Sequence, residues 1–259
     1  MDLGIRGRHA IVCAASQGLG RACAESLARE GCDLTIMART PGPLEEAAEA
    51  IRRTYGVRVT AVAGDVNSDA GHDALLAACP APDILVNNNG GPPFRDFRQL
   101  DREAILAGVS MNMVVPIELI QRVLDGMTGR GFGRIVNITS LSVKMPVPGL
   151  DLSSGARAGL TAFVSGIART VADRNVTINN LLPGYFDTKR MRGGITAASQ
   201  RGGISETEAE EQLRTKVPAK RFGSPEEFGN ACAFLCSAHA GYITGQSLLL
   251  DGGLYPAAF

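Results

Sequence analysis

Two glycines, Gly18 and Gly20, stand in a segment that could bind the phosphates of a nucleotide. They follow a short apolar run, Ala10–Ala14, and a segment with helical spacing opens after them at Arg21. Glycines at a strand-to-helix turn let the backbone approach a pyrophosphate closely, and the free N–H groups of the helix N-terminus favour its negative charge. A glycine pair alone is weak support, because turns of every kind contain glycine. Its place directly after the first apolar run strengthens the prediction of a nucleotide site.

A second residue with chemical consequences, Arg39, stands at the end of the next apolar run, Leu34–Ala38. An acidic side chain there would accept hydrogen bonds from a ribose 2′-hydroxyl and repel a 2′-phosphate, and Ile36–Thr40 contains none. The Arg39 guanidinium could instead pair with that phosphate through charge-assisted hydrogen bonds. An arginine on a solvated loop is the alternative interpretation. The sequence therefore favours NADP(H) over NAD(H).

The elements that position these residues alternate between short apolar runs and longer segments with helical spacing. Near-continuous apolar strands separated by helices indicate a parallel sheet covered on both faces. Right-handed crossovers then predict one doubly wound, Rossmann-type α/β domain over 1–259, with about seven parallel strands. The predicted strands are Ala10–Ala14, Leu34–Ala38, Val57–Ala63, Ile84–Asn87, Arg134–Thr139, Val176–Leu181 and Ser247–Leu250, and the predicted helices are Gly20–Glu30, Leu44–Tyr55, Asp101–Leu124, Ser154–Arg174 and Pro225–Cys236.

Capping signals mark two further boundaries near the C-terminus. Ser224 is followed by a proline and then by Glu227, which is the pattern of a capping box with proline at the first helical position. Ser205 and Glu208 repeat the pattern. The basic, then glycine-rich segment before them predicts a mobile substrate-loop insertion at about 189–216.

The chain resembles the short-chain dehydrogenase/reductase family over essentially its whole length. The turn after the first strand is similar to the family's TGxxxGxG fingerprint, and Pro183-Gly184 followed by Thr188 is similar to its loop over the nicotinamide. Further matches in chain order are Gly64-Asp65-Val66, Asn87–Gly90 and Thr244–Gly253. The resemblance implies a nicotinamide cofactor bound by Ala14, Ser16, Gln17, Gly18, Leu19, Gly20, Arg39, Asp65, Val66, Asn88, Asn89, Gly90, Arg157, Pro183, Gly184 and Thr188.

The fingerprint departs from the family pattern at Cys13 and Ala14, which stand in place of threonine and glycine. If the backbone at Ala14 needs a positive φ, an alanine there costs about 1–2 kcal/mol. If φ is negative, alanine fits without strain.

The catalytic positions depart from the pattern more strongly. Family members use an Asn-Ser-Tyr-Lys set, in which serine holds the carbonyl, tyrosine is the acid or base and lysine binds the ribose. The resemblance assigns the first two positions to Asn112 and Ser140, and it places Ser153 and Arg157 where the family has tyrosine and lysine. A serine hydroxyl is a far weaker acid than a phenol, whose pKa is about 10, and a guanidinium differs in geometry from an ammonium. Losing a positioned acid lowers the rate by roughly 10²–10⁴-fold.

Another side chain could replace the missing acid. Tyr185 and Lys189 form a literal YxxxK pattern, but in the loop after Pro183-Gly184, where a tyrosine is more typical of a substrate-pocket lining. Lys144 and Asp151 flank the altered motif, and for both we favour a solvated position. Tyr185 is retained as a catalytic candidate.

Composition excludes several other classes of protein. The formal net charge is zero, which argues against nucleic-acid or anionic-membrane partners, and no run of about 18 uninterrupted apolar residues predicts a membrane span. Six cysteines form no CxxC pair and lie in apolar runs, which favours core packing over a metal or redox site. We therefore expect no metal, and the reducing cytoplasm as location.

Three functions remain open. The favoured one is an NADP(H)-dependent oxidoreductase that transfers hydride between nicotinamide and a carbonyl or alcohol substrate, with acyl thioesters of the 3-oxoacyl type among the candidates. The second is a catalytically silent, nucleotide-binding homologue that acts as a structural or regulatory partner, and the third is a lyase or isomerase. The resemblance also implies a homotetramer or homodimer, paired through helices Asp101–Leu124 and Ser154–Arg174 by way of Gly155, Ala158, Gly159 and Ala162.

Overall fold

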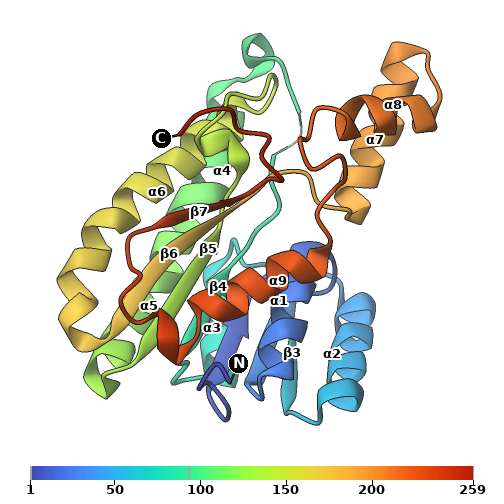
Figure 1. Cartoon of the computed structure of the whole chain (residues 1–259). Coiled ribbons are helices and arrows are strands. Elements are labelled where there is room, and N and C mark those ends of the chain that lie inside the picture. The colour runs from blue at the N-terminus through green and yellow to red at the C-terminus, as the bar shows by residue number, and fades with distance from the viewer. Residues whose placement is uncertain (1, 93, 259) are drawn as a thin grey trace.

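Seven short strands lie in one parallel sheet, in the order β3-β2-β1-β4-β5-β6-β7, in the computed structural model, which describes residues 2–92 and 94–258. This order confirms the predicted doubly wound α/β class, and each predicted strand is present with its ends shifted by two residues or fewer (Figure 1). The strands are β1 His9–Val12, β2 Asp33–Ala38, β3 Val59–Ala63, β4 Ile84–Asn87, β5 Gly133–Ile138, β6 Val176–Pro183 and β7 Ser247–Leu250.

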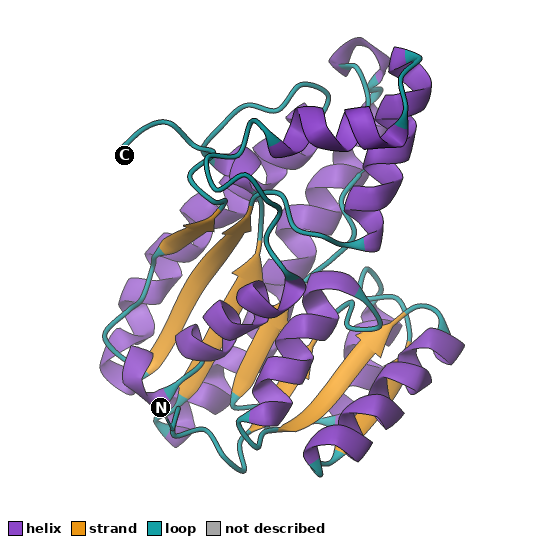
Figure 2. Ribbon diagram, turned by 45° about the vertical axis from the view of Figure 1, so that its right-hand side comes forward, coloured by secondary structure: helices purple, strands orange, loops and turns teal. Residues whose placement is uncertain are grey.

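Helices cover both faces of the sheet, as the continuous apolar strands require (Figures 1 and 2). One layer contains α1 Gly18–Arg29, α2 Pro41–Tyr55 and α9 Pro225–Leu235, and the other contains α3 Asp69–Ala78, α5 Val115–Arg130 and α6 Asp151–Val171. The sequence patterns predicted all of these except α3.

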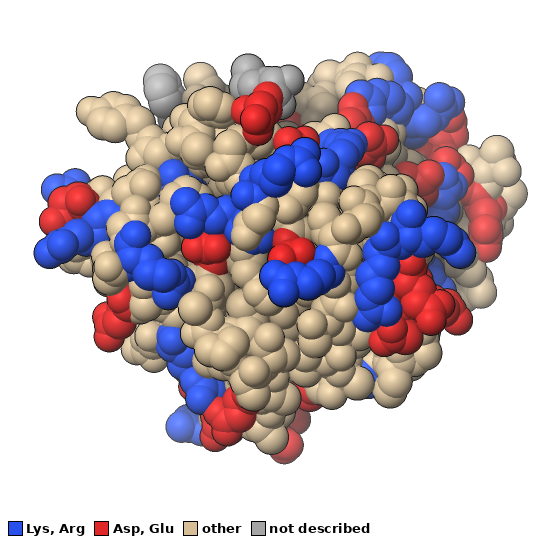
Figure 3. Space-filling model, turned by 90° about the horizontal axis from the view of Figure 1, so that it is seen from below, with Lys and Arg blue, Asp and Glu red and all other residues tan. Residues whose placement is uncertain are grey.

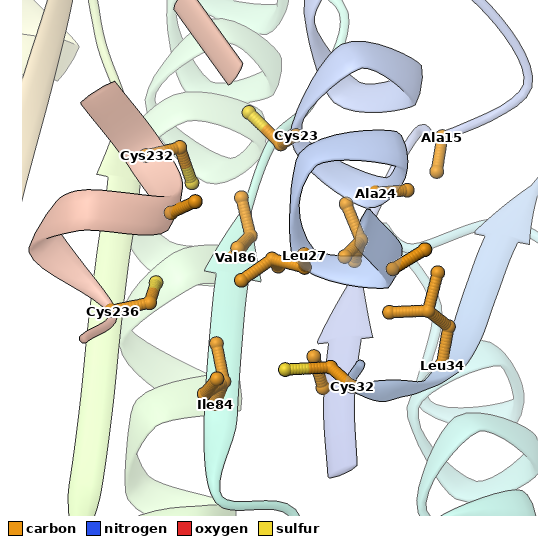
Figure 4. Close-up of a cluster of buried hydrophobic side chains, with 14 of the residues drawn as sticks. Ala15, Cys23, Ala24, Leu27, Cys32, Leu34, Ile84, Val86, Cys232 and Cys236 are labelled. Carbon is orange, nitrogen blue, oxygen red and sulfur yellow. The ribbon is translucent and has the colours of Figure 1, made fainter. Parts of the chain in front are cut away.

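The core under α1 and α9 is closely packed and contains most of the cysteines. Figure 4 shows Cys23 of α1 and Cys232 of α9 in this core, with Cys236 at the end of α9 and Cys32 lower down between the two helices and the sheet. A Cβ on Gly229 of α9 would lie 2.4 Å from a backbone oxygen of α1, so glycine is what lets the two helices approach. All six cysteines are free and buried, as predicted. Burial raises the pKa of the Cys13 thiol to about 12, so such thiols stay protonated.

The predicted helix Asp101–Leu124 is divided in the structure. It consists of α4 Arg102–Val109, a π-helical turn at Ser110–Val114, and α5. The Val115 N–H donates to the Ser110 carbonyl, five residues back, and Pro116 has no N–H with which to continue the usual ladder. Proline inside the apolar run was the signal for this break. Asn112 therefore lies in a π-helical turn and not in a regular α-helix.

The combined helix Arg102–Arg130 is the one element among the described residues that is long and apolar enough to cross a membrane, judged by length and composition alone. Its α5 part packs on β4, β5 and α6, which is the arrangement of a core helix. Seen from below, Lys and Arg side chains are spread across the middle of the surface, with Asp and Glu side chains among them and near the rim (Figure 3).

The segment predicted as an insertion at about 189–216 is largely helical. It forms α7 Lys189–Gly202 and α8 Glu206–Arg214, which pack against each other above the carboxyl ends of the strands (Figure 1). Thr188 caps α7, and both predicted capping boxes, at Ser205 and Ser224, are present. The mobility of this segment stays a prediction.

Candidate active site

The predicted site residues lie at the carboxyl ends of the strands. These ends lie together because all strands are parallel (Figure 1). The turn after β1 and the loop after β6 meet there. A Cβ built on Gly18 would lie 3.9 Å from Thr188 Cγ2, although the two residues are far apart in sequence. The structure thus brings together two of the segments assigned to a nucleotide by resemblance.

Backbone geometry explains the residues of the β1 turn. Gly18 has a φ of +61°, and a Cβ on Gly20 would stand 2.4 Å from the Ala14 carbonyl oxygen. That contact is too close for any side chain, so only glycine fits at position 20. Ala14 itself has a φ of +49°, so the conditional expectation of strain at this alanine is confirmed.

Replacing Ala14 by glycine is therefore expected to stabilise the protein by about 1 kcal/mol, because glycine adopts a positive φ without the Cβ clash. Chemical denaturation followed by circular dichroism measures this change. Ala15→Gly, at a buried neighbour without a positive φ, is the matched control and should destabilise the protein. A loss of stability in Ala14→Gly would show that the turn is not strained.

The N-terminus of α1 leaves its N–H groups available. Gln17 occupies the N-cap position without a side-chain hydrogen bond to the helix, and the first turn contains no acidic residue. Helices α3, α7, α8 and α9 differ, because a serine or threonine side chain caps each of them. Ser16 is half-buried beside Gln17, while Leu19 packs against the core. The exposed end of α1 is thus suited to bind an anion.

The loops after β3 and β4 are joined by hydrogen bonds. Asn89 donates to the Asn67 side chain at 2.6 Å and to the Met111 carbonyl at 3.1 Å, and Asn67 donates to Asp65 at 2.8 Å. Asn88 donates to the Ala14 carbonyl at 3.5 Å. The role of Asn67 as a bridge had no sequence signal, since it belongs to no motif.

The remaining residues of the predicted nucleotide site are arranged as follows. Val66 is buried, whereas Gly90 and Arg39 are exposed, and Arg39 forms no hydrogen bond or ion pair with any described residue. Its guanidinium is therefore available to a ligand. Pro183 ends β6, and a Cβ on Gly184 would lie 2.7 Å from that of Asp251, so glycine is required where the chain passes β7.

A row of side-chain amides crosses the sheet beneath this edge. Asn87 donates to Asn137 at 2.9 Å, Asn137 donates to Asn180 at 3.2 Å, and Asn180 donates to Ser247 at 3.3 Å. The four residues are register partners on β4, β5, β6 and β7, and the three asparagines are buried. Because buried amides need partners, this row fixes the relative positions of the strand ends that carry the site. It is visible only once the register is known.

Ser140 and Asn112 have side chains with unused hydrogen-bonding capacity. Ser140 Oγ accepts hydrogen bonds from the Ser142 N–H and hydroxyl, at 3.0 Å and 2.9 Å, which leaves its own proton to donate. Asn112 donates to the Gly108 carbonyl at 3.3 Å, but its buried Oδ1 has no partner among the described residues. A buried amide oxygen of this kind is a place for a water or ligand donor.

Ser153 and Arg157 lie side by side on α6, and their side chains are 6% and 8% exposed. Arg157 Nε donates to Ser153 Oγ at 3.2 Å, and Nη1 donates to the Ile138 carbonyl at 2.7 Å, at the end of β5. Burial, together with the charge of Arg190, lowers the pKa of Arg157 to about 10, so it remains a cation at neutral pH. The structure therefore places a buried positive charge near the strand end that leads to Ser140.

Tyr185 lies elsewhere. Its ring packs edge-to-face on Phe222 at 6.4 Å, and burial raises the pKa of its hydroxyl. It lines a cavity of about 350 Å³ together with residues of the loop after β7, and neither Ser140 nor Arg157 is among the lining residues. Asp151 begins α6 and is exposed, and Lys144 stands over the Tyr255 ring at 5.7 Å. None of these three side chains forms a hydrogen bond with Ser140 or Ser153.

The seven-stranded doubly wound sheet and its glycine turn define a Rossmann-type protein of the dinucleotide-binding class. Comparison with known sequences is more specific: a sequence model of the family described as Enoyl-(Acyl carrier protein) reductase matches residues 13–255. The chain belongs to the short-chain dehydrogenase/reductase family of oxidoreductases.

Two relatives and one solved structure illustrate the similarity. The NADPH-dependent reductase BacG of Bacillus subtilis is 33% identical, with 95% of this chain and 97% of the relative covered. The 3-oxoacyl-[acyl-carrier-protein] reductase FabG of Aquifex aeolicus is 32% identical, with 98% and 100% covered. The crystal structure of L-sorbose reductase from Gluconobacter frateurii, complexed with NADPH and L-sorbose, has a TM-score of 0.94 and 30% identity, and covers 99% of this chain and 100% of its own.

Proposed function

We propose that the protein is an NADP(H)-dependent reductase of small carbonyl compounds with an altered proton donor. The observation that carries this proposal is the uncapped N-terminus of α1, which the Gly18–Gly20 turn exposes beside the loop after β6. Relatives named as NADPH-dependent reductases, and a similar structure complexed with NADPH, support it.

The nucleotide would lie along the carboxyl edge of the sheet. The N–H groups that open α1 would bind its diphosphate, and Arg39, free of other partners, would pair with the 2′-phosphate. Asp65 and Val66 would border the adenine, Asn88–Gly90 the central part, and Pro183, Gly184 and Thr188 the nicotinamide. When bound, the nicotinamide supplies a hydride to the carbonyl carbon.

The side chains near the end of β5 would hold the substrate and stabilise the negative charge that develops on its oxygen. The Ser140 proton, which no described residue accepts, would donate to that oxygen. We place Ser153 and Arg157 at the family's tyrosine and lysine positions. Ser153 Oγ already accepts a hydrogen bond from Arg157, so its proton can also donate. Since a serine hydroxyl is a poor acid, Ser140 and Ser153 would donate hydrogen bonds to the oxyanion, and the nearby positive charge of Arg157 would stabilise it through space, until solvent protonates it.

The first test is a fluorescence titration with NADPH and, in parallel, with NADH. We expect clearly tighter binding of NADPH, and about a tenfold or greater loss of NADPH affinity in Arg39→Ala with little change for NADH, since a charge-assisted contact is worth roughly 1.5–3 kcal/mol. Arg53→Ala, an exposed arginine on α2, is the control. Failure of both nucleotides to bind would overturn the proposal.

Turnover then separates the reductase from a silent homologue. NADPH consumption is followed with small ketones, sugars and a 3-oxoacyl thioester, because relatives named for each of the last two classes are similar to this chain. Binding of NADPH without consumption on any substrate would favour the structural or regulatory alternative.

We also propose an oligomer formed through α4, α5 and α6. Gly155 has open space where a Cβ would be, whereas a Cβ on Gly159 would meet Met113 at 2.8 Å, so Gly159 packs within the subunit and Gly155 is free to face a partner. Large apolar side chains are exposed on α4 (Ile105 and Leu106), on α6 (Phe163) and in the π-helical turn before α5 (Val114). Exposed apolar surface of this kind is typical of an interface.

The oligomer is tested by light scattering. We expect a mass two or four times 27.2 kDa, and a monomer after Phe163→Glu, because a carboxylate would be buried without a partner. Phe97→Glu, on an exposed phenylalanine outside these helices, should leave the mass unchanged. A wild-type mass of 27.2 kDa would contradict the proposal.

A further inference from the structure

Arg157 is a buried cation to which no described residue supplies a carboxylate. Its side chain is 8% exposed, its hydrogen bonds go to a hydroxyl and a carbonyl, and none of the ion pairs in the described part of the chain includes it. A charge removed from water without a counter-ion is costly. A ligand that brings a negative charge would offset this cost.

Arg190 adds a second positive charge near the first. It belongs to α7, its guanidinium donates to the carbonyl oxygens of Gly91 and Pro92 at 3.5 Å, and its positive charge helps to lower the pKa of Arg157. Among the described residues, its guanidinium has only these two carbonyl oxygens as partners. Its neighbour Arg192 is different, because Asp187 and Glu210 both pair with it. The carboxylates of Asp187 and Glu210 thus neutralise Arg192, and neither of them pairs with Arg157 or Arg190.

The cofactor's diphosphate does not account for this charge. Its proposed place is the N-terminus of α1, at the end of β1, whereas Arg157 is anchored to Ile138 at the end of β5. Strand β5 is two positions from β1 in the sheet, or about 10 Å at the usual strand spacing. The substrate side of the site therefore has an excess of positive charge.

The guanidinium of Arg157 has N–H groups that make no hydrogen bond within the protein and can bind a planar anion. Nε and Nη1 each make one bond inside the protein, and Nη2 makes none with the described residues. The Nη2 protons and the second Nη1 proton can meet the two oxygens of a carboxylate, which is the geometry that distinguishes a guanidinium from the family's ammonium.

We propose that the substrate of this reductase is a carbonyl compound that also carries a carboxylate, and that Arg157 binds this carboxylate with Arg190 as the second cation. The choice of substrate rests on the proposed function, whereas the anion site itself rests on the two arginines.

The test compares 2-oxo, 3-oxo and 4-oxo acids with their methyl esters under saturating NADPH. We expect wild-type kcat/KM to be roughly 100-fold or more higher for the best acid than for its ester, because buried charge-assisted hydrogen bonds are each worth about a factor of ten or more. The acid-to-ester ratio is the readout, since effects on cofactor binding or on hydride transfer cancel in it.

Three variants test which arginines cause the preference for the acid over its ester. Arg157→Gln should bring the ratio close to one, and Arg190→Gln, at an exposed position that does not threaten folding, should lower it by about tenfold. Arg192→Gln is the matched control on the same helix, because its charge is already balanced by two carboxylates, and the ratio should stay at the wild-type value. A wild-type ratio near one, or a ratio that Arg157→Gln and Arg190→Gln both leave unchanged, would overturn the inference while the reductase remained.

A binding measurement separates failure of the inference from failure of the proposed function. Calorimetric titration of the protein–NADP⁺ complex with malonate, succinate and glutarate needs no turnover. Binding that Arg190→Gln weakens and Arg192→Gln does not would support the anion site even if no carbonyl compound is reduced. Absence of binding by all three, together with a ratio near one, would refute the anion site.

Discussion

The double variant Ser153→Tyr with Arg157→Lys is expected to raise kcat for neutral ketones by roughly 10²–10⁴-fold, the usual contribution of a positioned general acid. A phenol next to an ammonium is a far better proton donor than a serine hydroxyl. Both positions lie on one face of α6, four residues apart and already in contact, so the new pair would form at the same place.

The measurement is steady-state reduction of a ketone and of the matched oxo acid by wild type and variants. The double variant should reduce the ketone with a higher kcat and lose its preference for the acid. A lysine ammonium cannot offer the two parallel N–H donors with which the Arg157 guanidinium would bind a carboxylate. Ser153→Phe with Arg157→Lys is the control, since it has the size of the tyrosine without its proton. An equal gain in that control would show that the effect came from packing rather than from proton transfer, and no gain in the tyrosine variant would show that the site uses another donor.

The sequence predicted most of the fold because the fold depends on patterns that act locally. Apolar runs of strand length between segments of helical spacing predicted a doubly wound parallel sheet, and Ser224 with Glu227 predicted the start of α9. The π turn at Ser110–Val114 was missed, since it depends on the competition between an unbroken apolar pattern and the missing N–H of Pro116. Helix α7 was missed because glycines hide its periodicity, and tertiary packing on α8 overrides their low propensity.

The candidate site residues were assigned from the sequence, and their role stays a prediction. The resemblance pointed to Ser140, Ser153 and Arg157, and the parallel sheet explains why the ends of β5 and α6 that carry them lie near one another. The sequence could not indicate that Arg157 is buried, donates to a strand carbonyl and has no ion-pair partner among the described residues, because that depends on which side chains distant segments bring near it. The row of Asn87, Asn137 and Asn180 was hidden for the same reason, as it depends on strand register.

The residue whose loss should destabilise the protein most lies at the amino ends of the strands, at the opposite end of the sheet from the candidate site. Arg134, at the start of β5, is 1% exposed, and its guanidinium donates to the carbonyls of Ser237, Gly133 and Asn175 and to the Asn175 side chain. It also stacks over Phe132 at 4.4 Å. One side chain thus joins the strand to the turn before β6 and to the end of α9.

Arg134→Met should lower the free energy of unfolding by about 3–5 kcal/mol, because several charge-assisted hydrogen bonds are lost and their carbonyl partners stay buried, while methionine keeps the volume. Urea denaturation followed by circular dichroism measures it as a lower midpoint with an unchanged m-value. Arg8→Met is the control: Arg8 lies over the same Phe132 ring, at 3.9 Å, and pairs with Asp83, but its side chain is 40% exposed, so its loss should cost at most about 1 kcal/mol. Affinity for NADPH per folded molecule should not change in either variant, since Ser140 follows the other end of β5, about 20 Å away. Equal losses in the two variants would mean that the Arg134 hydrogen bonds add nothing beyond contact with the ring, and that the amino edge of the sheet is held by apolar packing alone.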